Sequence, residues 1–341
     1  MSSSLRASFG FLVACFLVAS GALVVAACGS PAEPAPDAAP PSTIPTSPAG
    51  TFAITSQLDI HVPAAAAPLV AMLTAATDGP DDPARFLVDR MIATLPEGSV
   101  KSLAERLSPY VAAYLSARLV ELAPRLAPGL DAMAVGLVRI ATHLGTVETL
   151  RIDAGGAATR TISGARFELG GSAVTVRFAD AGLPDVIAPL HVALDETGHL
   201  RLSEHAHPLP YGALLQLGLD RAVAVSVEPT ARDLAGALSA LVDCERLGAL
   251  VADRVGLGSA ALYTAACRAA MTAVASEVGD RIAAIDDGGL GLDVSGTATG
   301  LDADGDGTMD ELRGGSWSGS LYSDAARDPI AAASFAGGKA P

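Results

Sequence analysis

Residues 190–202 read LHVALDETGHLRL, and this stretch predicts a β-hairpin because apolar and polar residues alternate on both sides of a turn. A two-residue turn would place Val192 opposite Arg201. A three-residue loop that ends at a left-handed Gly198 instead places Val192 opposite Leu202. Only the second register matches the apolar faces of the two strands, so we expect that register.

The alternation continues outward from this hairpin over residues 146–229 and predicts an antiparallel β meander. Residues 51–145 are expected to form a strand and then helices. The strand is expected at 51–62, and the helices at 82–95, 108–124 and 126–144. Helical spacing of apolar residues over 230–286 predicts a helical hairpin. Alternation resumes over 287–341, on both sides of an acidic loop, and predicts a C-terminal β-hairpin.

The composition excludes two classes of protein. Half of the 341 residues are hydrophobic and only 17% are charged, whereas a disordered chain shows low hydrophobicity and high charge. The chain carries 37 acidic residues against 22 Lys and Arg, a formal net charge of −15. A nucleic-acid-binding protein needs a basic face to displace counterions from phosphates, so nucleic acid is not an expected partner.

The N-terminal segment has the features of a secretory signal. Arg6 carries the only side-chain charge of the first ten residues, and residues 11–27 are uncharged and mostly apolar. The sequence VAAC at residues 25–28 resembles the lipobox of bacterial lipoproteins. The resemblance implies a lipoprotein signal peptide over residues 1–27 and acylation of Cys28, which becomes the mature N-terminus. An ordinary cleaved signal or a short membrane anchor is the alternative.

Residues 28–50 form the predicted tether between the acylated cysteine and the folded body. This segment is rich in Pro, Ala and Ser, a composition typical of extended chain that buries no core. No Asp follows Cys28, so the resemblance favours the outer membrane of a bacterial cell envelope over retention at the inner membrane. The multiply acylated cysteine is the expected membrane partner, because one acyl chain alone binds a bilayer only marginally.

Two cysteines lie on the apolar faces of the predicted helical hairpin. If the chain reverses near Gly256, Cys244 and Cys267 lie at similar distances from the turn and face each other. In an exported protein this predicts a disulfide, and two buried free thiols are the alternative. For residues 51–341 we therefore expect an α+β fold, with an antiparallel β-sheet packed against amphipathic helices and a disulfide-linked helical hairpin.

The acidic loop, residues 302–310, reads DADGDGTMD and carries the clearest chemical pattern in the chain. Ca²⁺ prefers six to eight oxygen ligands. Alternate carboxylates, a glycine for the sharp turn and a main-chain carbonyl can supply several of them. The expected calcium ligands are Asp302, Asp304, Asp306, Thr308 (through its carbonyl) and Asp310.

The loop resembles the first part of an EF-hand and, more closely, the calcium loops of integrin-type propeller repeats. It departs from the EF-hand at position 12, where Arg313 replaces the bidentate Glu. Eight acidic residues and no Lys or Arg lie between Asp286 and Glu311, an excess that repels itself without a cation. The resemblance implies a weak, structural calcium site, and a solvated acidic turn is the alternative.

Four histidines cluster around the predicted hairpin. In the expected register His191 and His205 are diagonal neighbours on its polar face, which suggests a zinc or copper site. A solvent-facing polar strand face explains the same residues, and no Cys or acidic residue completes a ligand set. His191 and His205 are therefore only weak metal candidates.

Catalytic signatures are absent from the sequence, including the nucleophile elbow, the zinc-protease motif, the P-loop and the dinucleotide fingerprint. We therefore expect a non-catalytic, lipid-anchored envelope lipoprotein with a calcium-stabilised structural or binding role. The first alternative is a carrier of an apolar or lipid ligand, which requires a cavity above about 300 Å³. The second alternative is a hydrolase without a recognisable motif.

Overall fold

The computed structural model describes residues 43–75, 82–256, 258–324 and 326–340. The predicted signal peptide, Cys28 and the tether up to residue 42 lie outside these residues. The strands are β1 (Gly50–Asp59), β2 (His143–Ile152), β3 (Ala157–Leu169), β4 (Ser172–Arg177), β5 (Val186–Leu194), β6 (His199–Pro208), β7 (Gly291–Leu301), β8 (Glu311–Tyr322), β9 (Arg327–Pro329) and β10 (Ala332–Lys339). The helices are α1 (Ala67–Ala75), α2 (Asp82–Ala93), α3 (Ser99–Leu122), α4 (Leu126–Thr142), α5 (Tyr211–Gly218), α6 (Ala224–Val227), α7 (Leu234–Leu241), α8 (Cys244–Val255) and α9 (Ala260–Asp286), with a 3₁₀ turn η1 (Ala179–Ala181) and a π-helical turn η2 (Leu219–Val223).

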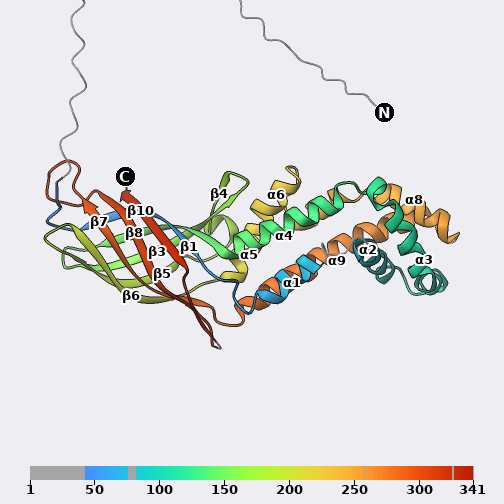
Figure 1. The fold of residues 1–341 in the computed structure, drawn as a ribbon, viewed down its shortest axis with the longest axis horizontal. Coiled ribbons are helices and arrows are strands. Elements are labelled where there is room, and N and C mark those ends of the chain that lie inside the picture. The colour runs from blue at the N-terminus through green and yellow to red at the C-terminus, as the bar shows by residue number, and fades with distance from the viewer. Residues whose placement is uncertain (1–42, 76–81, 257, 325, 341) are drawn as a thin grey trace, which may run out of the picture. The chain divides into compact units, whose positions relative to one another are not determined.

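The fold is α+β, and its sheet is a closed antiparallel barrel of eight strands (Figure 1). The strands follow the order β1-β2-β3-β5-β6-β7-β8-β10, and β10 pairs with both β1 and β8 to close the ring. Strands β4 and β9 extend the sheet outside the ring, against β3 and β8. The prediction of a sheet packed against helices is thus correct in class but misses the closure. Period-two alternation shows which residues share a face, but it does not show which edges pair.

The central hairpin has the predicted register. Strands β5 and β6 pair Val192 with Leu202 and Leu194 with Leu200. Gly198 is left-handed, with φ of 82°, as the three-residue loop requires. The prediction is confirmed because the apolar faces and the turn geometry favour the same alignment.

Apolar side chains fill much of the barrel interior. Phe52, Ile54 and Leu58 of β1 alternate inward and are at most 2% exposed. On β7, Gly296 leaves space for the indole of Trp317, because a Cβ at residue 296 would lie 2.6 Å from that ring. A side chain at residue 296 would therefore clash with the Trp317 ring.

The helices differ from the predicted ones in two places. Helix α3 includes Pro109, so the expected helix start at residue 108 is wrong. The Ser108 hydroxyl does not cap a helix but donates a hydrogen bond to the Asp89 carboxylate of α2 at 2.6 Å. The predicted meander ends at Pro208 instead of residue 229, and the chain continues as α5, η2 and α6. The N-terminus of α5 is held by a distant carboxylate, that of Asp286, which accepts hydrogen bonds from two amides at 2.6 and 2.9 Å.

The disulfide between Cys244 and Cys267 is present, with the two Cα atoms 5.6 Å apart. It links α8 to α9, and the predicted reversal is confirmed: Gly256 ends α8 with φ of 68°, and the Ser259 side chain caps α9. The apolar stripe expected before the turn is divided between α7 and α8, because Asp243 caps a new helix.

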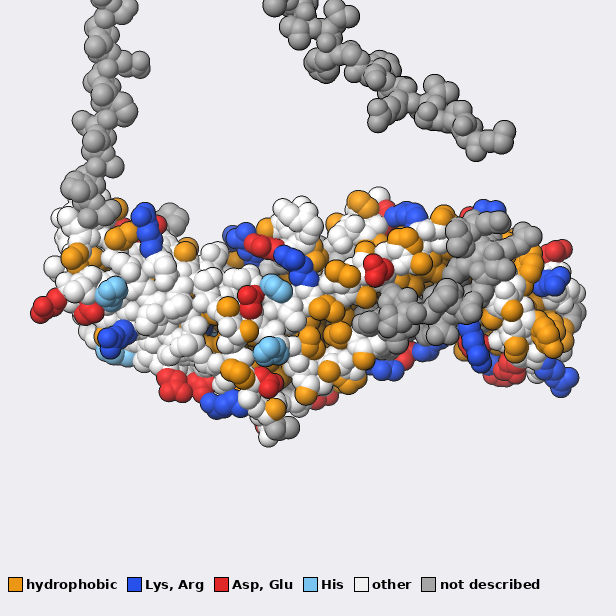
Figure 2. Space-filling model, in the orientation of Figure 1, with side chains coloured by type: hydrophobic (Ala, Val, Ile, Leu, Met, Phe, Trp, Pro, Cys, Tyr) orange, Lys and Arg blue, Asp and Glu red, His pale blue; other side chains and the backbone are white. Residues whose placement is uncertain are grey.

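Helix α9 contacts α2, α5, α7 and α8, while α4 packs against β2 and β3 and η2 packs against β3 and β4. Figure 2 shows hydrophobic side chains gathered over the helices of the visible face, whereas the strands display few. Val135 and Val138 of α4 and Val225 of α6 are the exposed valines of these helices. Among the residues the structure describes, no helix combines the length and apolar character needed to cross a membrane.

Removing the disulfide is expected to weaken the helical region. The combined variant Cys244→Ser with Cys267→Ser is predicted to lose about 3 kcal/mol of unfolding free energy, because the unfolded chain regains the entropy of a closed loop. Urea denaturation followed by circular dichroism measures this loss. A reductant should lower the unfolding free energy of the wild type and leave that of the variant unchanged. Equal unfolding free energies of the two proteins without reductant contradict the prediction.

Candidate functional site

The acidic loop lies between β7 and β8, and it brings together three of the five predicted calcium ligands. One carboxylate oxygen each from Asp302, Asp304 and Asp310 lies within 4.8 Å of the other two. Asp306 points elsewhere, because its Oδ1 accepts hydrogen bonds from the amide and hydroxyl of Thr308 at 2.6 and 2.5 Å. The loop therefore presents a partial set of oxygen ligands in the arrangement described.

Asp302 organises the loop from a buried position. It is 1% exposed, and its carboxylate accepts hydrogen bonds from the amides of Gly305 at 2.7 Å and Gly307 at 2.9 Å. Burial by itself raises the pKa of Asp302, but the hydrogen bonds from Thr43 and these amides outweigh it and lower the pKa. The charged carboxylate is thus stabilised by the shape of the loop.

A lysine supplies positive charge to the loop. The Nζ atom of Lys339, at the end of β10, lies 3.1 Å from Asp310 Oδ1 and 3.3 Å from the Thr308 hydroxyl. The acidic neighbours raise the pKa of Lys339, with the hydrogen bond to Asp310 as the main cause. Acidic excess in the local sequence is therefore not by itself evidence for a metal, because barrel closure brings this ammonium to the loop.

The end of the predicted tether packs along the acidic loop. Thr43 and Asp302 exchange main-chain hydrogen bonds at 2.8 and 3.1 Å, and the Thr43 hydroxyl donates to Asp302 Oδ2 at 2.8 Å. The amides of Thr46 and Ser47 both donate to the carbonyl of Gly307. The last part of the predicted tether, residues 43–47, is thus held by the acidic loop.

A second polar site lies inside the barrel, and the sequence analysis missed it. This interior cluster consists of Glu148 (β2), Arg160 (β3), His205 and His207 (both β6) and Trp317 (β8). The two oxygens of Glu148 accept from Arg160 Nε and Nη2 at 2.6 and 2.7 Å, and the two side chains are at most 1% exposed. The Arg160 guanidinium also lies 4.3 Å from the centre of the Trp317 ring.

Hydrogen bonds keep Glu148 charged inside the barrel. Burial raises its pKa, but the charge of Arg160 and the hydrogen bonds from Arg160, Thr146 and Ser56 lower it below the usual range. Ser56 also accepts a hydrogen bond from the indole N–H of Trp317 at 3.1 Å. Every strand that contributes to this cluster thus shares one connected polar network.

A β-bulge separates the two histidines that the sequence placed on one face. The register of β6 shifts between Leu202 and His205, so residues after the bulge change sides. His205 points into the barrel and is 6% exposed, whereas His191 stays on the outer surface. The predicted shared face of His191 and His205 is therefore wrong, and the structure does not bring these two side chains together.

The interior histidines are held neutral by their surroundings. His205 Nε2 lies 3.2 Å from Arg160 Nη1, and His205 Nδ1 lies 2.9 Å from the carbonyl of Ser203. Burial lowers the pKa of His205, and Arg160 lowers it further. Burial, Arg160 and His205 together lower the pKa of His207 to about 3.

The sequence held part of the signal for this cluster. Glu148 stands in phase with Leu150 and Ile152, and Arg160 stands in phase with Ile162, so both charges occupy inward positions of their strands. An acid and a base on the inward faces of adjacent strands indicate a buried ion pair. The bulge that turns the histidines inward has no comparable signal.

Breaking the buried ion pair is expected to destabilise the barrel strongly. Glu148→Gln or Arg160→Met alone should lower the unfolding free energy by about 3–5 kcal/mol, because each leaves an uncompensated buried partner. The double variant Glu148→Leu with Arg160→Met should lose less than either single variant. Urea denaturation measures all three.

The exposed pair of Glu311 and Arg313 provides a matched control. Arg313→Met should change the unfolding free energy by less than about 1 kcal/mol. If Arg160→Met costs no more than Arg313→Met, the interior pair does not have the role assigned to it.

Comparison with known proteins found no relative of this chain. No family model, no curated protein and no solved structure matches this chain. Its function must therefore be inferred from its own residues.

Proposed function

We propose that the chain is a lipid-anchored protein of the bacterial cell envelope, with a non-catalytic, calcium-stabilised structural or binding role. The lipobox resemblance at residues 25–28 and the apolar segment before it support the anchor. Acylated Cys28 would attach the chain to the membrane, and the residue pattern after Cys28 favours the outer membrane.

The observation that carries the proposal is the position of the acidic loop. Its three converging carboxylates lie on the same loop that holds residues 43–47, which lead from the anchor into the barrel. A cation bound there would neutralise the carboxylates and stabilise the attachment of this segment. The proposed role of calcium is therefore to fix the tether to the barrel.

Calcium binding needs two local changes. The Lys339 ammonium, which interacts with Asp310, must move away, because it and the cation would compete for the Asp310 carboxylate. Asp306 must rotate from Thr308 toward Asp304, and the carbonyl of Thr308 and water molecules would complete the ligand set. These changes oppose binding, so we expect a dissociation constant on the order of 10⁻⁴ M, as in extracellular calcium modules.

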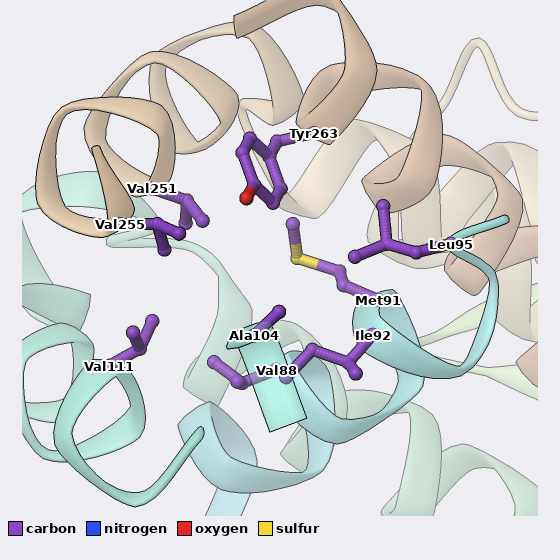
Figure 3. A pocket seen from close by; sticks show the side chains of 9 residues that line it. All are labelled: Val88, Met91, Ile92, Leu95, Ala104, Val111, Val251, Val255 and Tyr263. Atoms are coloured by element: carbon purple, nitrogen blue, oxygen red, sulfur yellow. The ribbon is translucent and has the colours of Figure 1, made fainter. Parts of the chain in front are cut away.

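Two cavities lined by described residues are too small for the apolar-carrier alternative. Figure 3 shows a hollow lined by apolar side chains of α2, α3, α8 and α9, among them Met91, Val255 and Tyr263. Its cavity volume is about 20 Å³, enough for about one water molecule and far too small for an acyl chain. A second cavity of about 210 Å³, beside Leu290 and Tyr322, is also below the volume that this alternative requires.

Calcium is expected to raise the melting temperature of the protein. At 1 mM calcium and a dissociation constant on the order of 10⁻⁴ M, binding stabilises the native state by about 1.4 kcal/mol. This corresponds to a rise of about 2–4 °C over the value in EDTA. Asp304→Asn should abolish the rise, because it removes a ligand charge from an exposed side chain.

Asp195→Asn is the matched control for this experiment, since Asp195 accepts similar hydrogen bonds in the β5–β6 turn. It should keep the full calcium response. Lys339→Gln should strengthen calcium binding several-fold by removing the competing ammonium. Equal melting temperatures in calcium and EDTA for both wild type and Lys339→Gln would leave the loop as a solvated acidic turn.

The anchor is tested independently of calcium. Cys28→Ser is predicted to move the protein from the detergent phase to the aqueous phase of a detergent partition of bacterial extracts, because the acylated thiol is lost. Mass spectrometry of the wild-type N-terminal peptide should show the added acyl mass on Cys28. An unmodified Cys28 contradicts the lipoprotein assignment.

A further inference from the structure

On the side that faces β5, strand β6 is paired over only three of its ten residues, from Val192–Leu202 to Leu194–Leu200. On their other edges, Val186–His191 of β5 pairs with β3, and β6 pairs with β7 from His199 to Pro208 with a bulge between. We call the segments Val186–His191 and Ser203–Pro208 the β5–β6 seam. In the described ladders, the seam is where the barrel has the least main-chain pairing between neighbouring strands.

A side chain takes the place of ladder hydrogen bonds at the start of the seam. The amide of His191 donates to the hydroxyl of Ser203 at 2.9 Å instead of to a carbonyl. Ser203 lies at the bulge that shifts the register of β6. Opening the seam therefore breaks fewer main-chain hydrogen bonds than opening any full ladder of the ring.

Both interior histidines stand on the seam half of β6. His207 is 2% exposed, and neither its Nδ1 nor its Nε2 has a hydrogen-bond partner among the described residues. A buried polar group without a partner favours any conformation that returns it to water. The imidazole rings of His205 and His207 lie nearly parallel with their centroids 5.8 Å apart, and both belong to the segment Ser203–Pro208.

The charged groups around the two rings oppose protonation of either imidazole. Arg160 on β3 faces His205 at 3.2 Å and is already paired with Glu148 on β2. Asp293 on β7 is the other acidic group acting on His205, and it is paired with Arg327. The side chains that β1, β8 and β10 place around this cluster, Ser56, Trp317 and Phe335, are uncharged.

We propose that the β5–β6 seam is an acid-operated opening of the barrel, in which protonation of His205 and His207 drives Ser203–Pro208 away from β5. Above about pH 6.5 both rings are neutral and the closed barrel is favoured. Below about pH 6.5, the two imidazoles take up protons in the open form, where they contact water. In the closed form they stay neutral, because they are buried next to Arg160. The opening equilibrium therefore rises as the pH falls.

The direction of this pH dependence follows from proton linkage. The closed form holds the pKa of both histidines below the ordinary value near 6.5, and that of His207 at about 3, whereas the open form has ordinary values. For a histidine that stays neutral in the closed form, the opening constant rises with the fraction of the open form that is protonated. Lowering the pH from 6.5 to 5.5 should thus raise it by about fivefold for His207 alone, and by up to about 30-fold if His205 responds as fully.

Native-state hydrogen exchange of the full chain, resolved to single amides, tests this proposal. The probe is the His191 amide, which is hydrogen-bonded across the seam to Ser203. Its protection, corrected for the intrinsic pH dependence of exchange, should fall at least about fivefold between pH 6.5 and 5.5. Protection of the β2–β3 ladder should stay constant over the same interval. Unchanged protection of the His191 amide, or an equal fall in both regions, overturns the proposal.

Three variants identify the groups that respond. His207→Leu should remove about fivefold of the fall in protection, and His205→Gln should also reduce the fall; one of them suffices if the other does not fold. His191→Asn changes an exposed histidine on β5 at the edge of the same seam and should behave as wild type. If His207→Leu and His205→Gln both retain the full fall in protection, the interior histidines do not operate the seam.

Discussion

Closure of the barrel by its last strand is the constraint on which the rest of the structure depends. Strand β10 pairs with β1 on one side and with β8 on the other, so that the interior faces of the eight strands lose contact with water. Glu148 and Arg160 must then pair with each other, because neither charge has solvent. The same closure places Lys339, at the end of β10, beside the acidic loop between β7 and β8.

The local elements could be read from the sequence wherever the determining contacts lie close along the chain. The register of the β5–β6 hairpin followed from its turn, and the disulfide of Cys244 and Cys267 followed from the reversal at Gly256. Barrel closure could not be read in this way, because the pairing of β1 with β10 joins the two ends of the folded body. The start of α5 also depends on a distant residue, Asp286, which no local pattern indicates.

The two polar sites show the same division. The converging carboxylates of the acidic loop come from one short motif, and the sequence found them. The interior cluster comes from β2, β3, β6 and β8. The sequence indicated it only through Glu148 and Arg160, which occupy inward-facing positions of their alternating strands. The bulge in β6 reversed the expected side of His205, because one inserted residue moves every later side chain to the opposite face.

Residues 43–47, which follow the segment of the proposed membrane anchor, meet the body of the protein at the acidic loop. Thr43 and Ser47 are bound by the loop that carries Asp302, so the segment leading from the anchor and the proposed calcium ligands form one unit. Calorimetric titration of the full chain with calcium tests this account most directly. The account predicts one saturable site with a dissociation constant on the order of 10⁻⁴ M. Absence of binding heat up to several millimolar calcium would contradict it.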